Sequence, residues 1–570
     1  MSQQPLDNAA AQALSRGLIT MLTRRRPLPK QLTPLEQTAL QDLVQALTHA
    51  LSRGEMSVNL GDGAPEPEGL SAKGWPATHR QALDRSGWLS EDPALMVLNG
   101  DQLLWQRWHQ GMTALENRLV QRSRLSPTGQ RSTHQPPRHS ADSKSNAQLN
   151  NEQQAAVEAI SRYRLVLLSG GPGTGKTSTV KAMLLRAIHD RGELRIHLAA
   201  PTGKAARRLQ EAVRRDPTTA GLPCTTLHRL LQARPGGFGR NRRHPLGLDL
   251  LVVDEMSMVD LNLAQALMDA LPDGAQLVLV GDENQLPPIG VGAVWQTLQS
   301  EGLQQRFGQA SIRLHAVYRN RGDLARLSHG LCQDGPDAFW QGVSALDDAS
   351  NVKPILTSST RLPDPVLKAI HQRMDALSKA SQALSISADG EPDPHQAHAL
   401  LEQLDCLMVL CPRRRGLWGV ETLHRQLVAG QGPDAWPEGL PVLCSDNQTE
   451  LGLANGDLGI CIGHGFSRRL LFRCSDDAGN SCCRLLHPAR VKQLQPALAL
   501  TIHKAQGSEA DDVILLWPPQ DDRPTTALLY TAMTRARRHL TIVRLAATVI
   551  ESSVIGSSVT GSTVTGSQAQ

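Results

Sequence analysis

The chain has 570 residues, of which 40% are hydrophobic and 20% charged, and its formal net charge is +5. This length exceeds what one hydrophobic core supports, so we expect several domains of ordinary globular composition. The sequence shows neither a membrane-spanning apolar run nor a signal-peptide pattern, which favours a cytoplasmic protein with no membrane partner. The nine cysteines contain no CxxC pair and do not predict a zinc site.

The N-terminal part of the chain divides into a structured region and a linker. Residues 1–122 have helical periodicity, and short strand-like runs follow within 94–108. The stretch 123–147 is polar and rich in Pro and Ser, which is typical of a linker because it cannot bury a core.

The rest of the chain predicts two α/β domains. Apolar strands alternate with helices over 148–321, and a second α/β domain is expected over 322–545, where a helical and loop-rich segment comes first and strands such as CLMVLC, DDVILLW and HLTIVRL follow. Short strand-like runs predict a small β insertion at about 441–495. The low-complexity repeat at 546–570 predicts a disordered tail.

A phosphate-binding loop is the most informative motif. GGPGTGKTS, which begins at Gly170, follows an apolar strand and opens a helix, as the pattern GxxxxGK[ST] requires. A glycine-rich loop at a helix N-terminus turns backbone N–H groups toward phosphate, and this predicts ATP as the cofactor. The nucleotide contacts predicted in this loop are Gly171, Pro172, Gly173, Thr174, Gly175, Lys176, Thr177 and Ser178.

Two carboxylates at the end of another apolar strand complete the predicted chemistry. LDLLVVDEMSM ends its strand at Asp254 and Glu255. We expect Asp254 and Thr177 to hold Mg²⁺, and Glu255 to act as general base on the attacking water. Lys176 is expected to reach the β- and γ-phosphates.

Three further residues are candidates for contact with the reacting phosphate. Gln285 follows the strand AQLVLVGD and could sense the γ-phosphate. Arg319 and Arg535 could act as arginine fingers, because guanidinium stays charged and binds phosphate oxygens bidentately. Either arginine taken alone is typical of a surface residue, and only its motif favours the catalytic interpretation.

The ordered motifs resemble those of superfamily 1 helicases, in the branch that moves 5′ to 3′. LNNEQQAAV, APTGKAARRL, TTLHRLL, VYRN, TIHKAQGSEADDV and LLYTAMTRARRHL are similar to family motifs and span roughly seven-tenths of the chain. The resemblance implies that Gln153 reads adenine, that Tyr318 stacks on it, and that Glu509 also belongs to the cofactor site. The residues that it implies for DNA binding are Thr202, Lys204, Thr226, His228, Thr501, His503 and Lys504.

Within this branch the chain is most similar to the RecD family, through DLLVVDEMSMVDL, GLANGDLGI and TIHKAQGSE. This implies two RecA-like P-loop domains with parallel sheets, a small SH3-like β insertion in the second, and a mainly helical N-terminal domain that binds partners. It also implies an ATP- and Mg²⁺-dependent 5′-to-3′ DNA helicase in an exodeoxyribonuclease V that repairs double-strand breaks by recombination. The implied partners are single-stranded and duplex DNA ends and RecB-like and RecC-like subunits of a heterotrimer.

Some features depart from the family pattern and leave alternatives open. Ala505 and Ala510 replace the usual Ser and aromatic residue of the fifth motif, and the strand-splitting pin implied at about 231–247 is short. A stand-alone DNA or RNA helicase is one alternative, and a DNA-bound structural clamp with vestigial ATPase is another. The sequence shows no nuclease constellation, so any exonuclease activity is expected from a partner.

Overall fold

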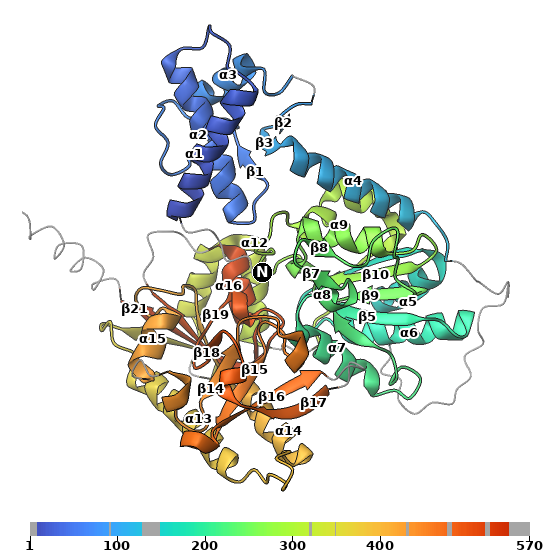
Figure 1. Cartoon of the computed structure of the whole chain (residues 1–570), viewed down its shortest axis with the longest axis vertical. Helices are drawn as coiled ribbons and strands as arrows, with labels where there is room; N and C mark the ends of the chain where they lie inside the picture. Colours follow the sequence, from blue (N-terminus) through green and yellow to red (C-terminus); the bar gives the residue numbers. More distant parts are fainter. Residues whose placement is uncertain are drawn as a thin grey trace, which may run out of the picture.

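A computed structural model of the chain describes residues 8–90, 93–127, 149–318, 322–347, 349–428, 432–475, 481–518 and 525–546. Two α/β lobes lie below an N-terminal, mainly helical region, and the helix α4 (Gln106–Ser123) runs from that region across the first lobe (Figure 1). Most of the predicted linker, nearly all of the predicted tail and Arg319 lie outside the described residues.

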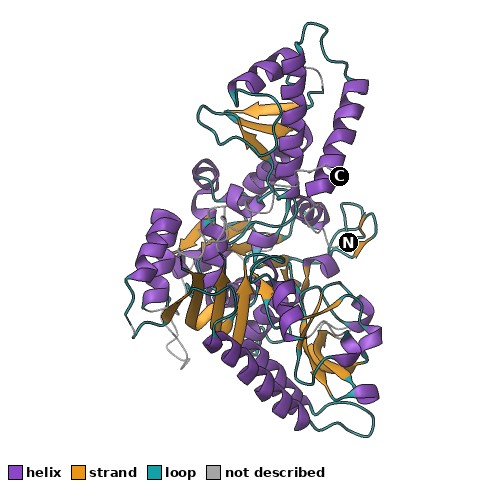
Figure 2. Cartoon of the chain, turned by 90° about the vertical axis from the view of Figure 1, so that its left-hand side faces the viewer, coloured by secondary structure: helices purple, strands orange, loops and turns teal. Residues whose placement is uncertain are grey.

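The N-terminal region packs helices against a small antiparallel sheet. Thr33 starts α2 with a capping box, in which its hydroxyl accepts from the Glu36 N–H and the Glu36 carboxylate accepts from the Thr33 N–H. Buried Leu43 and Trp88 belong to the core of this region. Its sheet has the order β1-β3-β2 and stands apart from the sheets of the lobes in Figure 2. The other elements are α1 (Asn8–Arg25), α2 (Pro34–Ser52), β1 (Ser57–Asn59), α3 (Ala77–Ser86), β2 (Met96–Asn99) and β3 (Gln102–Trp105).

The first lobe is built on a six-stranded parallel sheet of order β11-β4-β10-β9-β5-β6. Its strands β4, β9 and β10 are buried along their whole length, which explains their continuous apolar sequences. The strands are β4 (Leu165–Gly170), β5 (Ile196–Ala200), β6 (Cys224–Thr226), β9 (Leu250–Val253), β10 (Gln276–Gly281) and β11 (Ser311–Leu314). The helices are α5 (Asn151–Arg162), α6 (Lys176–Arg191), α7 (Gly203–Arg214), α8 (Leu227–Leu230), α9 (Leu261–Ala270), α10 (Val294–Leu298) and α11 (Glu301–Phe307).

A two-stranded hairpin, β7 (Ala233–Arg234) and β8 (Gly237–Phe238), lies within the stretch for which the family resemblance implies a pin. Each strand has only two residues, so the hairpin is short. None of the helices in the described ranges is long and apolar enough to span a membrane.

The second lobe has a five-stranded parallel sheet of order β12-β21-β20-β13-β19. The three strands expected from sequence are present, but the segment read as helical and loop-rich also contains β12, which pairs with β21 at the sheet edge. Its exposed, interrupted pattern hides it from a search for buried strands. The strands are β12 (Val352–Thr357), β13 (Leu407–Cys411), β19 (Leu500–Thr501), β20 (Ala510–Trp517) and β21 (Ala536–Leu545). The helices are α12 (Asp323–Ser344), α13 (Asp364–Gln382), α14 (Pro394–Glu402), α15 (Val420–Leu427) and α16 (Thr526–Met533).

An antiparallel sheet is inserted between β13 and β19 of the second lobe. Its order is β17-β16-β15-β14-β18, and every pairing in it is antiparallel. Its strands are β14 (Pro441–Cys444), β15 (Leu458–Ile462), β16 (Arg469–Ser475), β17 (Ser481–Leu486) and β18 (Leu494–Pro496).

The helix α7 of the first lobe forms ion pairs with the second lobe. Its cations occupy positions i, i+3 and i+4, which lie on one helix face. Lys204 pairs with Asp405 at 3.4 Å, Arg207 with Asp457 at 2.8 Å and Arg208 with Glu509 at 2.6 Å, and all three carboxylates belong to the second lobe or its insertion. In Figure 1, α7 lies on the side of the first lobe that faces the inserted sheet.

The Arg207–Asp457 pair predicts a measurable contribution to stability. The two side chains are only 12% and 2% exposed, so Arg207→Met leaves a buried charge without its partner. We expect the free energy of unfolding to fall by about 3 kcal/mol. The matched control is Arg162→Met, which removes an exposed pair with Glu158 at 3.4 Å and should cost about 0–1 kcal/mol. Equal decreases in melting temperature for the two variants would contradict the prediction.

His197 on β5 predicts a pH-dependent contribution to stability. Its Nε2 lies 2.9 Å from Thr225 Oγ1, and burial lowers its pKa from 6.5 to about 4. The unfolded chain therefore takes up a proton before the folded chain does, and stability is lost as pH falls from 6.5 toward 4. At pH 5.5 the loss is about 1 kcal/mol. Melting temperatures at pH 7.5 and 5.5 should show His197→Gln gaining on the unaltered chain at the lower pH, whereas parallel decreases would refute this role.

Candidate nucleotide site and nucleic-acid interface

The carboxyl ends of three neighbouring parallel strands form the core of the site. Because β4, β10 and β9 are adjacent and parallel, the loops that follow them meet at one edge of the sheet. The phosphate-binding loop follows β4, Asp282 follows β10, and Asp254 follows β9. The topology thus brings together residues from Gly170 to Asp282, which are far apart in sequence.

The phosphate-binding loop has the backbone that its glycines predict. Gly175 caps α6 in the left-handed conformation, at φ 86°, and a Cβ there would lie 2.7 Å from Gln153 Nε2. Glycine is therefore favoured by the backbone conformation, and any side chain here would also displace the Gln153 amide. The Lys176 ammonium donates to the Gly170 and Gly171 carbonyl oxygens at 2.6 and 3.0 Å. Thr177 is half-buried and Ser178 exposed at the start of the same helix.

Asp254 and Glu255 form a strained pair of acidic residues. Glu255 is one of a few non-glycine residues with positive φ, at 54°, and its N–H donates to Asp254 Oδ1 at 2.8 Å. Burial and then the Glu255 charge raise the pKa of Asp254 to about 6, while Lys176 acts in the opposite direction. Such a carboxylate gains from a nearby cation, and together with the Thr177 hydroxyl it offers the oxygen ligands that Mg²⁺ prefers.

Asp282 is a member of the site that sequence reasoning missed. It is 1% exposed and accepts from Gln285 Nε2 and from the Tyr530 hydroxyl, each at 3.2 Å. Burial raises its pKa, and the Lys176 charge opposes that shift. Its position directly after a buried parallel strand, as with Asp254, is the signal that could have identified it.

Gln285 carries a buried acceptor that no described residue satisfies. The side chain is 4% exposed and its Nε2 donates to Asp282, but among the described residues its Oε1 has no hydrogen-bond partner. An unpaired buried acceptor costs about 1–3 kcal/mol unless a ligand or water fills it. This atom therefore fits a site in which a bound group or water completes the hydrogen bonding.

Gln153 and Tyr318 lie together beside the phosphate-binding loop. Gln153 is buried, its Nε2 lies 3.5 Å from Thr174 O, and its Oε1 accepts from the Asn150 N–H. The Tyr318 N–H donates to Gly173 O at 2.8 Å, and its hydroxyl accepts from Asn150 Nδ2 at 2.9 Å. The ring is 50% exposed, so an aromatic face is available next to an amide, as the adenine-binding prediction requires.

The second lobe reaches the same site through α16. The Tyr530 hydroxyl would lie 2.9 Å from a Cβ on Gly171, and it donates to Asp282. Arg535, just beyond α16, is 2% exposed and donates to Thr531 O, Ser508 O and Thr534 Oγ1. Glu509 pairs with Arg208 and Arg537, so its carboxylate lies in a bridge between the lobes.

The residues implied for DNA binding occupy loop and helix-start positions in both lobes. Thr202 and Thr226 cap α7 and α8 by accepting from backbone N–H groups, and Thr501 accepts from the Lys504 N–H. The exposed His228 ring lies 6.4 Å from Phe238 of the short hairpin.

The two lysines of this set have protein partners. Lys504 donates to Ser445 Oγ and Gln495 Oε1 in the inserted sheet, and Lys204 pairs with Asp405. Thr202 and the segment that holds Thr501, His503 and Lys504 adjoin, because a Cβ on Gly507 would lie 3.2 Å from Thr202 Oγ1.

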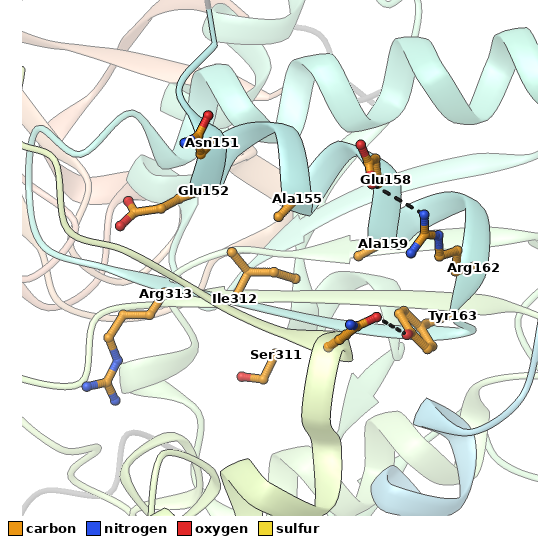
Figure 3. A pocket seen from close by; sticks show the side chains of 11 residues that line it. Asn151, Glu152, Ala155, Glu158, Ala159, Arg162, Tyr163, Ser311, Ile312 and Arg313 are labelled. Carbon is orange, nitrogen blue, oxygen red and sulfur yellow. Dashed lines mark hydrogen bonds and ion pairs between the residues drawn. The ribbon is translucent and has the colours of Figure 1, made fainter. Parts of the chain in front are cut away.

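A surface hollow of about 490 Å³ lies outside this site, between α5 and β11 (Figure 3). Glu152, Glu158 and Arg162 line it from the helix, and Ser311 and Arg313 from the strand. Its lining includes no residue of the phosphate-binding loop, so the hollow is distinct from the nucleotide site.

Two known families match this chain, one in each lobe. The AAA domain family matches residues 153–291, and the UvrD-like helicase C-terminal domain family matches residues 496–543. Among solved structures, Bacteroides Pif1 bound to ssDNA is 18% identical, with a TM-score of 0.40, and the match covers 70% of this chain and 92% of that one.

Curated relatives give a closer match. The RecBCD enzyme subunit RecD of Mycobacterium tuberculosis is 34% identical over 429 residues, which cover 70% of each chain. The ATP-dependent RecD2 DNA helicase of Deinococcus radiodurans is 33% identical over 404 residues, which cover 68% of this chain and 48% of the relative. An identity of 34% over 70% of this chain and 70% of the mycobacterial RecD shows common ancestry. The chain therefore belongs to the RecD family of ATP-dependent DNA helicases.

Proposed function

We propose that this chain is the 5′-to-3′ helicase subunit of a RecBCD-type exodeoxyribonuclease V, acting on DNA ends in double-strand-break repair and recombination. The observation that carries the proposal is the meeting of both lobes at one buried cluster, where Asp282 faces Lys176 and accepts from Tyr530. Hydrolysis at such a junction can change the position of one lobe relative to the other, and a translocating motor requires such a change.

The residues of the first lobe supply the hydrolytic chemistry. Lys176 would bind the β- and γ-phosphates, and Thr177 and Asp254 would hold Mg²⁺, which would supply positive charge to neutralise the phosphate oxygens. Glu255 accepts a proton from the attacking water, and its left-handed backbone fixes the side chain at the strand end. The Oε1 of Gln285, for which the described part of the chain offers no donor, accepts from that water or senses the γ-phosphate.

The arginines complete the proposed mechanism from outside the phosphate-binding loop. Arg535 adjoins α16, whose Tyr530 contacts the loop, and a rotation of its guanidinium away from backbone carbonyls would present it to the γ-phosphate. Arg319 follows Tyr318 by one residue and is proposed as the second finger on the family resemblance alone.

DNA grips from the two lobes would alternate as the junction opens and closes. Thr202, Thr226 and His228 would hold the strand from the first lobe, and Thr501, His503 and Lys504 from the second. Hydroxyls and cations suit phosphate contacts that are indifferent to sequence. Lys204 would join them by exchanging Asp405 for a phosphate.

The relation to relatives favours the subunit over a stand-alone enzyme. The mycobacterial relative, which is 34% identical over 70% of each chain, is a subunit of the RecBCD enzyme. We therefore propose RecB-like and RecC-like partners, with the N-terminal region as the binding surface for them. Purification with a tagged chain from its native host should recover the two partners in equal amounts, whereas a monomer that unwinds DNA at full rate would support the stand-alone alternative.

Lys176→Gln should abolish ATP hydrolysis stimulated by single-stranded DNA. Loss of the cation that faces the phosphates should lower kcat by roughly 100-fold or more, with DNA affinity in the absence of nucleotide nearly unchanged. The control is Lys181→Gln, which makes the same change on the same helix at a residue paired with Asp216 at 3.2 Å. Turnover by Lys176→Gln equal to that of the control would refute the assignment.

Duplexes with a single-stranded overhang test the direction and the motor itself. We expect unwinding of a duplex with a 5′ overhang and little unwinding of one with a 3′ overhang, measured by strand separation with and without partner subunits. DNA binding with neither ATP hydrolysis nor strand separation on either substrate, in the complete complex, would favour the clamp alternative. Preference for the 3′ overhang would contradict the proposed direction.

A further inference from the structure

The loop between α2 and β1 contacts the segment that follows Gln285. Gly54 lies at this turn in the left-handed conformation, at φ 83°, and its carbonyl oxygen accepts from the Gly292 N–H at 3.1 Å. A Cβ on Gly54 would lie 2.7 Å from Pro288 O, a backbone atom that cannot rotate away. The N-terminal region thus touches residues 286–292, here called the sensor loop, backbone against backbone.

The other end of the sensor loop is held by the second lobe. The Leu286 N–H donates to Thr531 Oγ1 at 2.9 Å, and the Leu286 carbonyl oxygen accepts from Gln506 Nε2 at 3.0 Å. Thr531 is completely buried and directly follows Tyr530, the residue that donates to Asp282. Both ends of the sensor loop are therefore fixed by parts of the molecule outside the first lobe.

The first lobe holds the loop along its length. The Leu261 N–H at the start of α9 donates to Val291 O at 3.1 Å, and Met56, next to the Gly54 turn, packs against the first-lobe core. Gln285 immediately precedes the loop, and its own carbonyl oxygen accepts from Gln296 Nε2 at 3.3 Å. Only a few residues separate Gly292 from Gln285, so a shift of the loop at Gly292 should also move Gln285.

We propose that Gly54 is a positioning residue for ATP hydrolysis, through which the N-terminal region fixes the sensor loop and so the place of Gln285. This inference rests on the proposed function, because it assigns Gln285 its role at the γ-phosphate. The N-terminal region then has a route to the nucleotide site that does not pass through DNA. A protein bound to that region can change the rate of hydrolysis by moving the Gly54 turn.

Gly54→Ala tests the proposal against a matched control, Gly63→Ala. Gly63 has nearly the same backbone conformation, at φ 79°, but a Cβ there would meet nothing within 4 Å. The two variants therefore share the strain of alanine at positive φ and differ in the clash with the sensor loop. Gly54→Ala should lower kcat for DNA-stimulated ATP hydrolysis by roughly 10-fold, with the KM for ATP changed less than twofold.

Amide hydrogen exchange on the full chain gives a readout that does not need activity. Gly54→Ala should speed exchange at both Leu286 and Gly292 by about tenfold relative to Gly63→Ala, because both N–H groups depend on the same loop. Met56→Ala, a milder change, should act in the same direction and covers the case in which Gly54→Ala does not fold. Equal exchange and equal kcat in the Gly54 and Gly63 variants would overturn the proposal, as would faster exchange at Gly292 with none at Leu286.

These outcomes separate the inference from the proposed function. An unaltered chain that does not hydrolyse ATP with DNA and partners would remove the proposed function, while the exchange at Leu286 and Gly292 would still decide whether Gly54 positions the loop. Normal hydrolysis by the unaltered chain, with no effect of either the Gly54 or the Met56 substitution, would leave the helicase function intact and reject the positioning role.

Discussion

One buried carboxylate, Asp282, makes the two lobes depend on each other. It is almost completely shielded from water, where an ionised carboxylate is costly unless donors and cations surround it. Those groups are the Asn284 N–H and the Gln285 amide beside it, Lys176 in the phosphate-binding loop, and Tyr530 in the second lobe. Withdrawal of the second lobe removes a donor from a buried charge, so the chemistry of the first lobe and the position of the second are energetically coupled.

Most of the nucleotide site could be predicted from the sequence because its residues sit at strand ends and in short motifs. Gly175, Lys176 and the Asp254–Glu255 pair follow buried apolar strands, and parallel pairing of those strands brings them to one edge without further information. Asp282 also directly follows a buried parallel strand, but no strong motif surrounds it, so the sequence alone did not identify it. The α/β alternation of the two lobes and the presence of a β insertion also followed from apolar runs, whereas the parallel sheets were implied by the family resemblance.

The parts that sequence could not predict are long-range contacts. β12 reads as exposed and irregular because it is an edge strand, and only its pairing with β21 gives it order. Of the α7 cations, the resemblance singled out only Lys204, and the carboxylate partners of all three lie roughly two to three hundred residues away in sequence. Gly54 lies in no recognisable motif, and only its close contact with the sensor loop shows that a side chain there would clash.

The Arg207–Asp457 bridge has a mechanical consequence. Asp457 belongs to the turn that leads into β15 of the inserted sheet, where it also accepts from the Ala454 N–H, so the bridge fastens the insertion to the first lobe. Separation of the lobes would therefore pull on the insertion as well as on the second lobe itself. The inserted sheet belongs to the second lobe and is bound to the first, so its position depends on the separation between the two lobes.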